Sequence, residues 1–125
     1  MSLCILAGGK VTVIAATAFS LSWIHSVEKI EWQEDWAIVD AEFVLTEARV
    51  KGSGAGMDPG DGARLVNGWW TWHPEAPPVG TLHLAASGAT VSGWKICYGP
   101  QDDCMTFGEA AGDTIALAEC GPEGG

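Results

Sequence analysis

The chain has 125 residues, and its 16 acidic and 6 basic side chains give a formal net charge of −10 at pH 7. This length is typical of one domain with a sizeable hydrophobic core. A hydrophobic content of 47% with seven tryptophans indicates a folded protein and argues against a disordered chain. The negative charge argues against nucleic acid and anionic membrane surfaces as partners. It suits a soluble protein, or one that meets a basic surface or a cation.

Two short strands are predicted near the N-terminus, at Cys4–Ala7 and Lys10–Ala16, with a turn at Gly8-Gly9 between them. Residues 1–6 lack the basic segment of a secretory signal, so we expect no signal peptide. The span that follows Lys10 is poor in charge, but its alternating pattern favours a strand. We therefore expect no transmembrane segment.

Two consecutive β-hairpins are predicted between Phe19 and Lys51. Residues 19–27 and 30–38 both alternate between the two faces of a strand, which is typical of strands with one buried side. A turn at Glu28-Lys29 places the large apolar residues of both strands on one face, and a one-residue slip would destroy this arrangement. The expected pairs are Val27 with Ile30, His25 with Trp32, Trp23 with Glu34, Leu21 with Trp36, and Phe19 with Ile38.

The second hairpin is expected to turn near Asp40-Ala41 into a strand at Glu42–Lys51. With the same face inward, the expected pairs are Ile38 with Phe43, Trp36 with Leu45, Glu34 with Glu47, and Trp32 with Arg49. Directly opposed residues lie about 5 Å apart and diagonal ones about 7 Å apart. We therefore expect four polar side chains to converge in a tryptophan-lined patch: His25, Glu34, Glu47 and Arg49.

Two interpretations of this cluster stay open. Two neighbouring carboxylates raise each other's pKa unless a cation lies between them, and Arg49 or a protonated His25 would supply that cation. Alternatively, Arg49 and Glu47 pair as surface charges at the solvent-exposed end of the sheet. His25 and Glu34 are harder to explain as surface residues, because apolar residues flank them along their own strands.

The same stretch resembles a bacterial family catalogued as domain of unknown function 1850. The resemblance is carried by the run His25-Ser26-Val27-Glu28-Lys29, by Glu34, by Leu45-Thr46-Glu47-Ala48-Arg49, and by Gly54-Ala55-Gly56. It covers about residues 10 to 72, extending more loosely to Gly68-Trp69. The signature residues are candidates for ligand binding or for a structural role: His25, Ser26, Glu28, Glu34, Glu47, Arg49, Gly54 and Gly56. The chain departs from the family pattern at Gly52-Ser53, where a bulkier aromatic residue is expected.

The resemblance implies an association with TRAP-type solute transporters of the TAXI class, beside which members of the family tend to be encoded. It supplies no established catalytic residue. It also implies an exported protein with a periplasmic or extracytoplasmic location. Because no signal peptide is visible in the sequence, a cytoplasmic location also stays open.

The four cysteines allow three disulfide pairings. Cys97 and Cys104 flank a turn-rich connector and could face each other across a hairpin, while Cys4 and Cys120 lie near the two chain ends, which often meet in one domain. We favour these two disulfides over a tetracysteine zinc site, because no pair has Cys-x-x-Cys spacing. Free thiols in a cytosolic protein are a third option.

The remainder of the chain predicts further β structure. Gly52–Gly62 is expected to be a connecting loop, and Leu65–His73 a strand on which Trp70 and Trp72 share one side and Trp69 takes the other. These tryptophans suit core packing, or a platform on which sugars stack. The other expected elements are a hairpin formed by Thr81–Ala86 and Thr90–Tyr98, a helical turn at Met105–Ala111, and a last strand at Thr114–Cys120.

These elements predict an all-β fold, an antiparallel β-sandwich or small barrel of about eight to nine short strands. We expect a single domain over residues 1–121 and a disordered tail at 122–125. No motif for a serine or cysteine nucleophile is present. We also expect no cofactor and no metal.

Three functional hypotheses follow from the sequence. The first is a non-enzymatic accessory or ligand-binding protein that works with a TRAP-type permease or its solute-binding protein. The second is a small hydrolase or isomerase that uses His25 with Glu34 or Glu28 as an acid/base pair. The third is a purely structural role, in which the signature stabilises the hairpin turn.

Overall fold

The computed structural model describes residues 2–24, 30–51, 62–84, 93–99, 103–108 and 114–120. Within these ranges the chain forms strands and no helix, so no described helix is able to cross a membrane. The strands are β1 (Ser2–Ala7), β2 (Lys10–Ala15), β3 (Ala18–Ile24), β4 (Glu31–Val39), β5 (Glu42–Lys51), β6 (Arg64–Val66), β7 (Trp69–Trp72), β8 (Thr81–Leu84), β9 (Trp94–Tyr98), β10 (Asp103–Phe107) and β11 (Ile115–Glu119).

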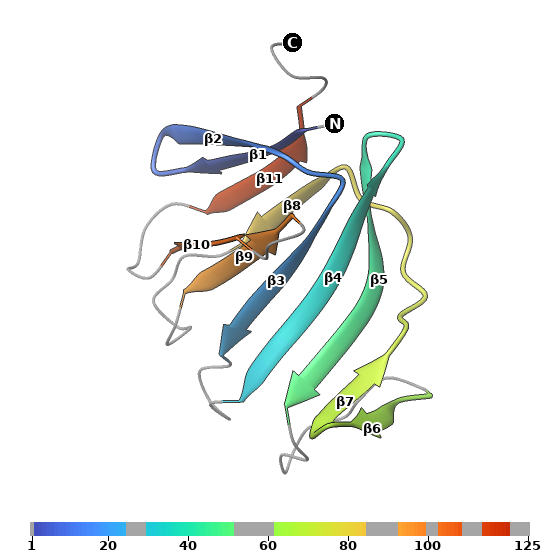
Figure 1. Cartoon of the computed structure of the whole chain (residues 1–125). Helices are drawn as coiled ribbons and strands as arrows, with labels where there is room; N and C mark the ends of the chain where they lie inside the picture. Colours follow the sequence, from blue (N-terminus) through green and yellow to red (C-terminus); the bar gives the residue numbers. More distant parts are fainter. Residues whose placement is uncertain are drawn as a thin grey trace.

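The strands form two antiparallel sheets in a sandwich-like arrangement (Figure 1). The smaller sheet has the order β2-β1-β11-β8, and the larger has the order β10-β9-β3-β4-β5-β7-β6. The predicted all-β fold is therefore confirmed, and of the two architectures left open, sandwich or barrel, the structure has the sandwich-like one. The described residues form eleven strands in place of the expected eight to nine. The long strands β3, β4 and β5 extend beyond the smaller sheet in Figure 1.

The hydrophobic core lies between the two sheets. Leu3 and Ile5 of β1 and Leu117 of β11 are fully buried from the smaller sheet, and Phe43 and Ile96 are fully buried from the larger one. Full burial of such a side chain contributes about 1.5–3 kcal/mol, so this layer is the main source of stability. The ring of Phe43 also packs edge-on against that of Phe19, with centroids 5.6 Å apart.

Three tight turns have positive φ at both central residues, which is the type I′ geometry that fits twisted hairpins. Two of them are the predicted turns: Gly8-Gly9 has φ of 58° and 77°, and Asp40-Ala41 has φ of 52° and 64°. The third, Asn67-Gly68, has φ of 51° and 86°. It divides the predicted strand Leu65–His73 into the hairpin of β6 and β7, so the expectation of one strand there was wrong.

Two further expectations were wrong. The predicted hairpin between Thr81–Ala86 and Thr90–Tyr98 does not form, because β8 pairs with β11 in the smaller sheet and β9 pairs with β3 in the larger one. The expected helical turn at Met105–Ala111 is replaced over its first part by β10. This strand pairs with β9 over its whole length, and Cys104 lies directly opposite Cys97.

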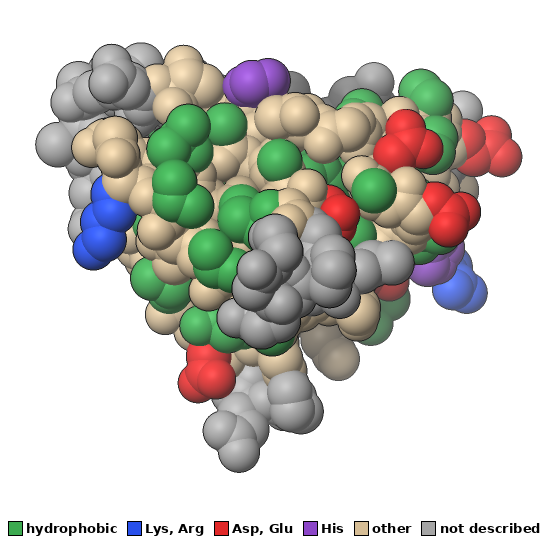
Figure 2. Space-filling view, turned by 90° about the horizontal axis from the view of Figure 1, so that it is seen from above, with side chains coloured by type: hydrophobic (Ala, Val, Ile, Leu, Met, Phe, Trp, Pro, Cys, Tyr) green, Lys and Arg blue, Asp and Glu red, His purple; other side chains and the backbone are tan. Residues whose placement is uncertain are grey.

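The outer surface of the smaller sheet carries exposed apolar side chains. Leu6, Val11 and Val13 are 47%, 56% and 53% exposed, whereas the inward-facing Leu3 and Ile5 of the same sheet are fully buried. Seen from above, hydrophobic side chains are spread over this face of the molecule, and the acidic side chains visible there lie mostly towards one end (Figure 2). We refer to Leu6, Val11 and Val13 as the apolar outer patch.

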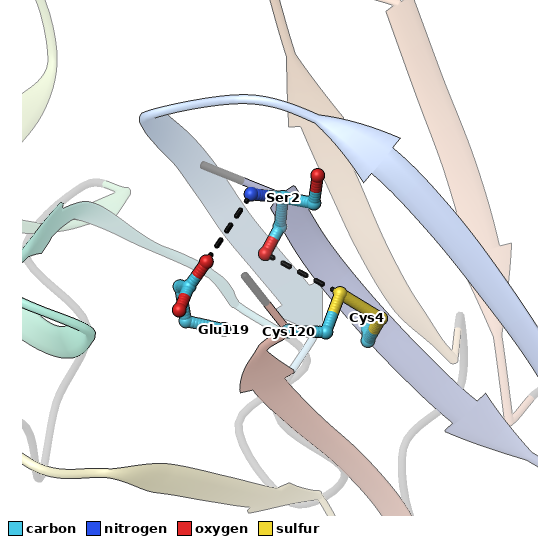
Figure 3. Close-up of a disulfide and its surroundings, with 4 residues drawn as sticks. All are labelled: Ser2, Cys4, Glu119 and Cys120. Atoms are coloured by element: carbon cyan, nitrogen blue, oxygen red, sulfur yellow. Dashed lines mark hydrogen bonds between the residues drawn. A yellow bond between two sulfur atoms is a disulfide. The ribbon is translucent and has the colours of Figure 1, made fainter. Parts of the chain in front are cut away.

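Two disulfides join the cysteines in the pairs that the sequence predicted, Cys4 with Cys120 and Cys97 with Cys104. The first joins β1 to the residue that follows β11 (Figure 3). Beside it, the backbone N–H of Cys120 donates to the carbonyl of Ser2 over 3.0 Å, and the Ser2 N–H donates to Glu119 Oε2 over 3.4 Å. The Cys120 sulfur lies 3.6 Å from that carbonyl but carries no proton, so this approach is a contact only. The first and last strands are thereby held side by side.

Candidate functional site

The pairing of β3 with β4 differs from the predicted register by two residues. Trp32 pairs with Trp23, where His25 was expected, and Glu34 pairs with Leu21, where Trp23 was expected. Likewise, Phe19 lies opposite Trp36. Because side chains alternate with a period of two, a two-residue shift changes every partner but leaves every residue on its predicted face. The predicted face was therefore correct and the predicted pairs were wrong.

The pairing of β4 with β5 follows the prediction near the turn and then departs from it at a β-bulge. Ile38 pairs with Phe43 and Trp36 with Leu45, as expected, but the next pair is Asp35 with Glu47. Thr46 is the extra residue of β5, and its hydroxyl donates to the Asp35 carbonyl over 3.0 Å. A bulge inserts one residue into one strand, so the strand beyond it presents the opposite alternation to its partner.

The bulge separates the polar residues that the sequence placed together. Beyond it, Glu34 pairs with Ala48 and Trp32 pairs with Val50, while Arg49 pairs with Gln33. Glu47 and Arg49 therefore share the outer face of the larger sheet with Asp35, and Glu34 lies on the inner face. The expected convergence of Glu34 with Glu47 and Arg49 was wrong.

Arg49 is the centre of a hydrogen-bonded network on the outer face. Its guanidinium donates to both oxygens of Asp35, over 2.8 and 2.9 Å, to Gln33 Oε1 over 3.0 Å, and to Glu47. The pKa of Arg49 is raised above its ordinary value, mainly because of the bonds to Asp35. All three guanidinium nitrogens donate within the network, so Arg49 holds together two carboxylates that lie directly opposite each other.

The signature residues His25, Ser26, Glu28, Gly54 and Gly56 lie outside the described residues. Their proposed roles in ligand binding or in the hairpin turn stay predictions. Of the eight signature residues, the structure describes Glu34, Glu47 and Arg49.

Glu34 is a half-buried carboxylate on the inner face of the larger sheet. Its cross-strand neighbours are Leu21 and Ala48, and its neighbours on the same face of β4 are Trp32 and Trp36. Burial raises the pKa of Glu34, and the hydrogen bond from Trp36 Nε1 to Glu34 Oε1, 3.2 Å long, partly opposes that rise. No basic side chain pairs with Glu34 among the residues that the structure describes.

Four tryptophans from four strands form a row on the same inner face, next to Glu34. Trp23 of β3 stacks on Trp32 of β4, with ring centroids 6.2 Å apart and an interplanar angle of 12°. Trp94 of β9 packs on the other side of Trp23, with ring centroids 5.0 Å apart. Trp72 of β7 meets Trp32 edge-on, with centroids 6.5 Å apart and an interplanar angle of 84°. All four rings are half-buried. We call Trp23, Trp32, Trp72 and Trp94 the tryptophan row.

The sequence analysis did not predict this row as a unit. Alternation placed Trp23 and Trp32 on one face, and Trp70 and Trp72 on one side of their own strand. The order of the strands, which brings β9 and β7 to either side of the central hairpin, is set by long-range pairing. That pairing leaves no local signal in the sequence.

Trp32 has a further property that most buried tryptophans lack. Its indole Nε1 is buried and has no hydrogen-bond partner in the described structure. Buried polar groups are nearly always paired, and an unpaired one costs about 1–3 kcal/mol. The contacts with its aromatic neighbours therefore hold the ring of Trp32 in place, although its N–H donor is unsatisfied.

Two surface grooves border the larger sheet, and Glu34 lines neither of them. The larger, of about 810 Å³, lies along β3, β4 and β9 and includes Thr17, Ser20, Asp35 and Tyr98. The smaller, of about 320 Å³, is lined in part by Ser22, Glu31 and Lys95 of the outer face. Side chains in the larger groove are mostly small, and its carboxylate Asp35 is already bound by Arg49. Among the described residues, no group of three or more metal-ligating side chains is placed to hold a metal ion.

Comparison with known proteins gives one match. The model of the family described as Domain of unknown function (DUF1850) matches residues 19–105. This span includes β3 to β9 and most of β10, so nearly the whole of the larger sheet, with Glu34 and the tryptophan row, lies within it. It reaches further towards the C-terminus than the predicted resemblance and leaves β1, β2 and β11 outside. No curated protein and no solved structure matches the chain.

Proposed function

The chain belongs to the DUF1850 family, and we propose that it is a non-enzymatic ligand-binding protein that acts as an accessory to a TRAP-type transporter of the TAXI class. The observation that carries the binding function is the tryptophan row beside the half-buried Glu34. Ligand sites in proteins are mostly aromatic and apolar, with a small number of polar groups that fix the orientation of the ligand. The inner face of the larger sheet has this composition.

The transporter association comes from the resemblance of the signature residues to the family, and the apolar outer patch supports it. Exposed apolar side chains that lie together mark interaction surfaces more often than isolated ones do. Leu6, Val11 and Val13 lie on the smaller sheet, away from the tryptophan row, so a protein partner and a small ligand would not compete for one surface. The partner we propose is the permease or its solute-binding protein.

The proposed location is periplasmic or extracytoplasmic. Both cysteine pairs are joined as disulfides, and such bonds persist mainly in oxidising compartments. This supports the location that the family resemblance implies.

Affinity purification of the tagged protein from its own host in mild detergent tests the association. We expect a permease or solute-binding subunit to be enriched over an untagged strain, and we expect Val13→Lys to reduce that enrichment. Val66→Lys is the matched control, because Val66 is similarly exposed, at 48%, but lies on β6 at the far edge of the other sheet. Recovery of no transporter component with the wild-type protein would contradict the association.

A second candidate function is a small hydrolase or isomerase in which Glu34 acts with His25 or Glu28. The observation that favours it is the pKa of Glu34, which burial raises in the direction that suits a general acid. Any activity found by substrate screening is expected to be lost in His25→Gln and in Glu34→Gln. Turnover that survives both substitutions would exclude this pair as the catalytic groups.

A further inference from the structure

We propose that the tryptophan row and Glu34 bind an organic cation of the quaternary ammonium type. This inference rests on the proposed ligand-binding function and names the chemical class of its ligand. It is argued from the charge of Glu34, from the geometry of the rings around it, and from the position of Arg49 on the opposite face of the sheet.

Glu34 is a carboxylate without a counter-ion in the described structure. Its one hydrogen bond there is from Trp36 to Oε1, which leaves Oε2 without a described partner. Arg49, which follows the cross-strand partner Ala48, lies on the opposite face and is engaged by Asp35. A half-buried carboxylate that lacks a cation is an unfavourable arrangement, and a bound cation would relieve it.

The rings beside Glu34 favour a cation with a low hydration energy. Trp32 precedes Glu34 by two residues on the same face of β4. Glu34 pairs with Ala48, and Ala48 pairs in turn with Trp72 on the next strand, so only the small Ala48 lies between Glu34 and Trp72. Trp32 and Trp72 meet at 84° and so form two walls of a corner. Tryptophan is the best aromatic partner for a cation, and quaternary ammonium groups are typically recognised by cages of aromatic rings.

The unpaired Nε1 of Trp32 agrees with a binding role for this corner. A purely structural tryptophan would gain stability from a hydrogen-bonded N–H, yet this ring is kept where its N–H is unsatisfied. The stacking of Trp32 on Trp23 holds the ring perpendicular to Trp72, which is the arrangement that the cation requires. The protein thus forgoes a stabilising hydrogen bond at Trp32, where the orientation of the ring favours binding of the ligand.

Calorimetric titration with choline chloride tests the proposal, with 3,3-dimethylbutan-1-ol as the neutral probe of the same shape. An equal concentration of sodium chloride controls for screening of the net charge of −10. We expect choline to bind at least tenfold more tightly than the alcohol. We expect Glu34→Gln to weaken choline at least tenfold and to leave binding of the alcohol unchanged.

Two further variants separate the cation site from general packing. Glu31→Gln removes a charge from the outer face of the same strand and is expected to bind choline as the wild type does. Trp72→Leu is expected to lose choline binding, whereas Trp72→Phe retains an aromatic wall and part of the affinity. These comparisons are made on variants that unfold cooperatively in urea and elute from a size-exclusion column at the wild-type volume.

Equal binding of the two probes, or choline affinity unaffected by Glu34→Gln, would overturn the cation inference and leave the ligand-binding function intact. Absence of choline binding combined with enrichment of a transporter subunit would also overturn it without touching the association. If neither probe binds and no transporter subunit is enriched, both the inference and the proposed function fail.

Discussion

Glu34 and Asp35 are neighbours on one strand, but their carboxylates lie on opposite faces of the larger sheet and have different hydrogen-bond partners. Asp35 lies on the outer face, where it accepts two hydrogen bonds from Arg49. Glu34 lies on the inner face among tryptophans, where its described partner is the indole of Trp36. Asp35 is thus neutralised within the protein, whereas Glu34 has no basic partner among the described residues.

The two faces also use tryptophan differently. On the inner face the ring of Trp32 stacks on Trp23 and meets Trp72 edge-on. On the outer face Trp69 contacts Lys51, with the ammonium 4.8 Å from the ring centroid. The outer ring already has its cation.

Removal of an inner ring is the change with the largest expected effect. Trp32→Ala deletes the member of the row that contacts both Trp23 and Trp72, and we expect it to lower the free energy of unfolding by about 2 kcal/mol, since the ring is half-buried. Trp69→Ala, on the outer face, is expected to cost less than about 1 kcal/mol. Urea unfolding followed by far-ultraviolet circular dichroism measures both, and equal costs would break the distinction between the faces.

Removal of the outer cation is expected to come next. Arg49→Gln leaves Asp35 directly opposite Glu47 with no positive charge between them, and like charges in that position are destabilising. Because both carboxylates are partly exposed, at 38% and 28%, we expect a loss of about 1 kcal/mol. The loss is expected to shrink in 1 M salt, since salt screens the repulsion. A loss that is independent of salt would point to packing instead of charge.

The two neighbouring carboxylates are expected to respond in opposite directions to loss of charge. Asp35→Asn weakens the bonds to Arg49 and is expected to destabilise the protein by several tenths of a kcal/mol. Glu34→Gln removes a desolvated charge and is expected to stabilise it slightly at neutral pH. Thermal unfolding of the two variants side by side checks the signs, and the same sign for both would show that the faces do not differ electrostatically.

The pH dependence of the Glu34→Gln effect gives the finest test. Because burial raises the pKa of Glu34 in the folded protein, the folded state keeps this proton at pH values where the unfolded chain has already lost it. Unfolding then releases the proton, so the wild type loses stability as pH rises from the unfolded pKa of about 4.3 towards the folded value. We expect Glu34→Gln to be no more stable than the wild type at the acidic end of this pH range. Its stability relative to the wild type is expected to increase as the pH rises through the range. An advantage that does not vary with pH would contradict the raised pKa.

The sequence by itself determined the class of fold and the facing of the central residues. Alternation placed Phe19, Leu21 and Trp23 on the face shared by Trp32, Glu34 and Trp36, and the turns at Gly8-Gly9 and Asp40-Ala41 followed from local residue preferences. Both disulfide pairs also agreed with their positions along the chain. These features depend on neighbours in the sequence, or on the simple tendency of chain ends to meet.

Only the tertiary structure decided which residues meet. A shift of two residues between β3 and β4 leaves the alternation unchanged, so the pattern could not choose between Trp23 and His25 as the partner of Trp32. The bulge at Thr46 moved Glu47 and Arg49 to the other face by inserting one residue. The apolar residues of β5 change phase there, from Phe43 and Leu45 to Ala48 and Val50, and the expectation of unbroken alternation overlooked this signal. The exchange of β8 from a local hairpin to β11 depends on contacts between distant parts of the chain. Periodicity fixes which face a side chain takes, but partners depend on register and strand order, which the packing of the whole sandwich selects.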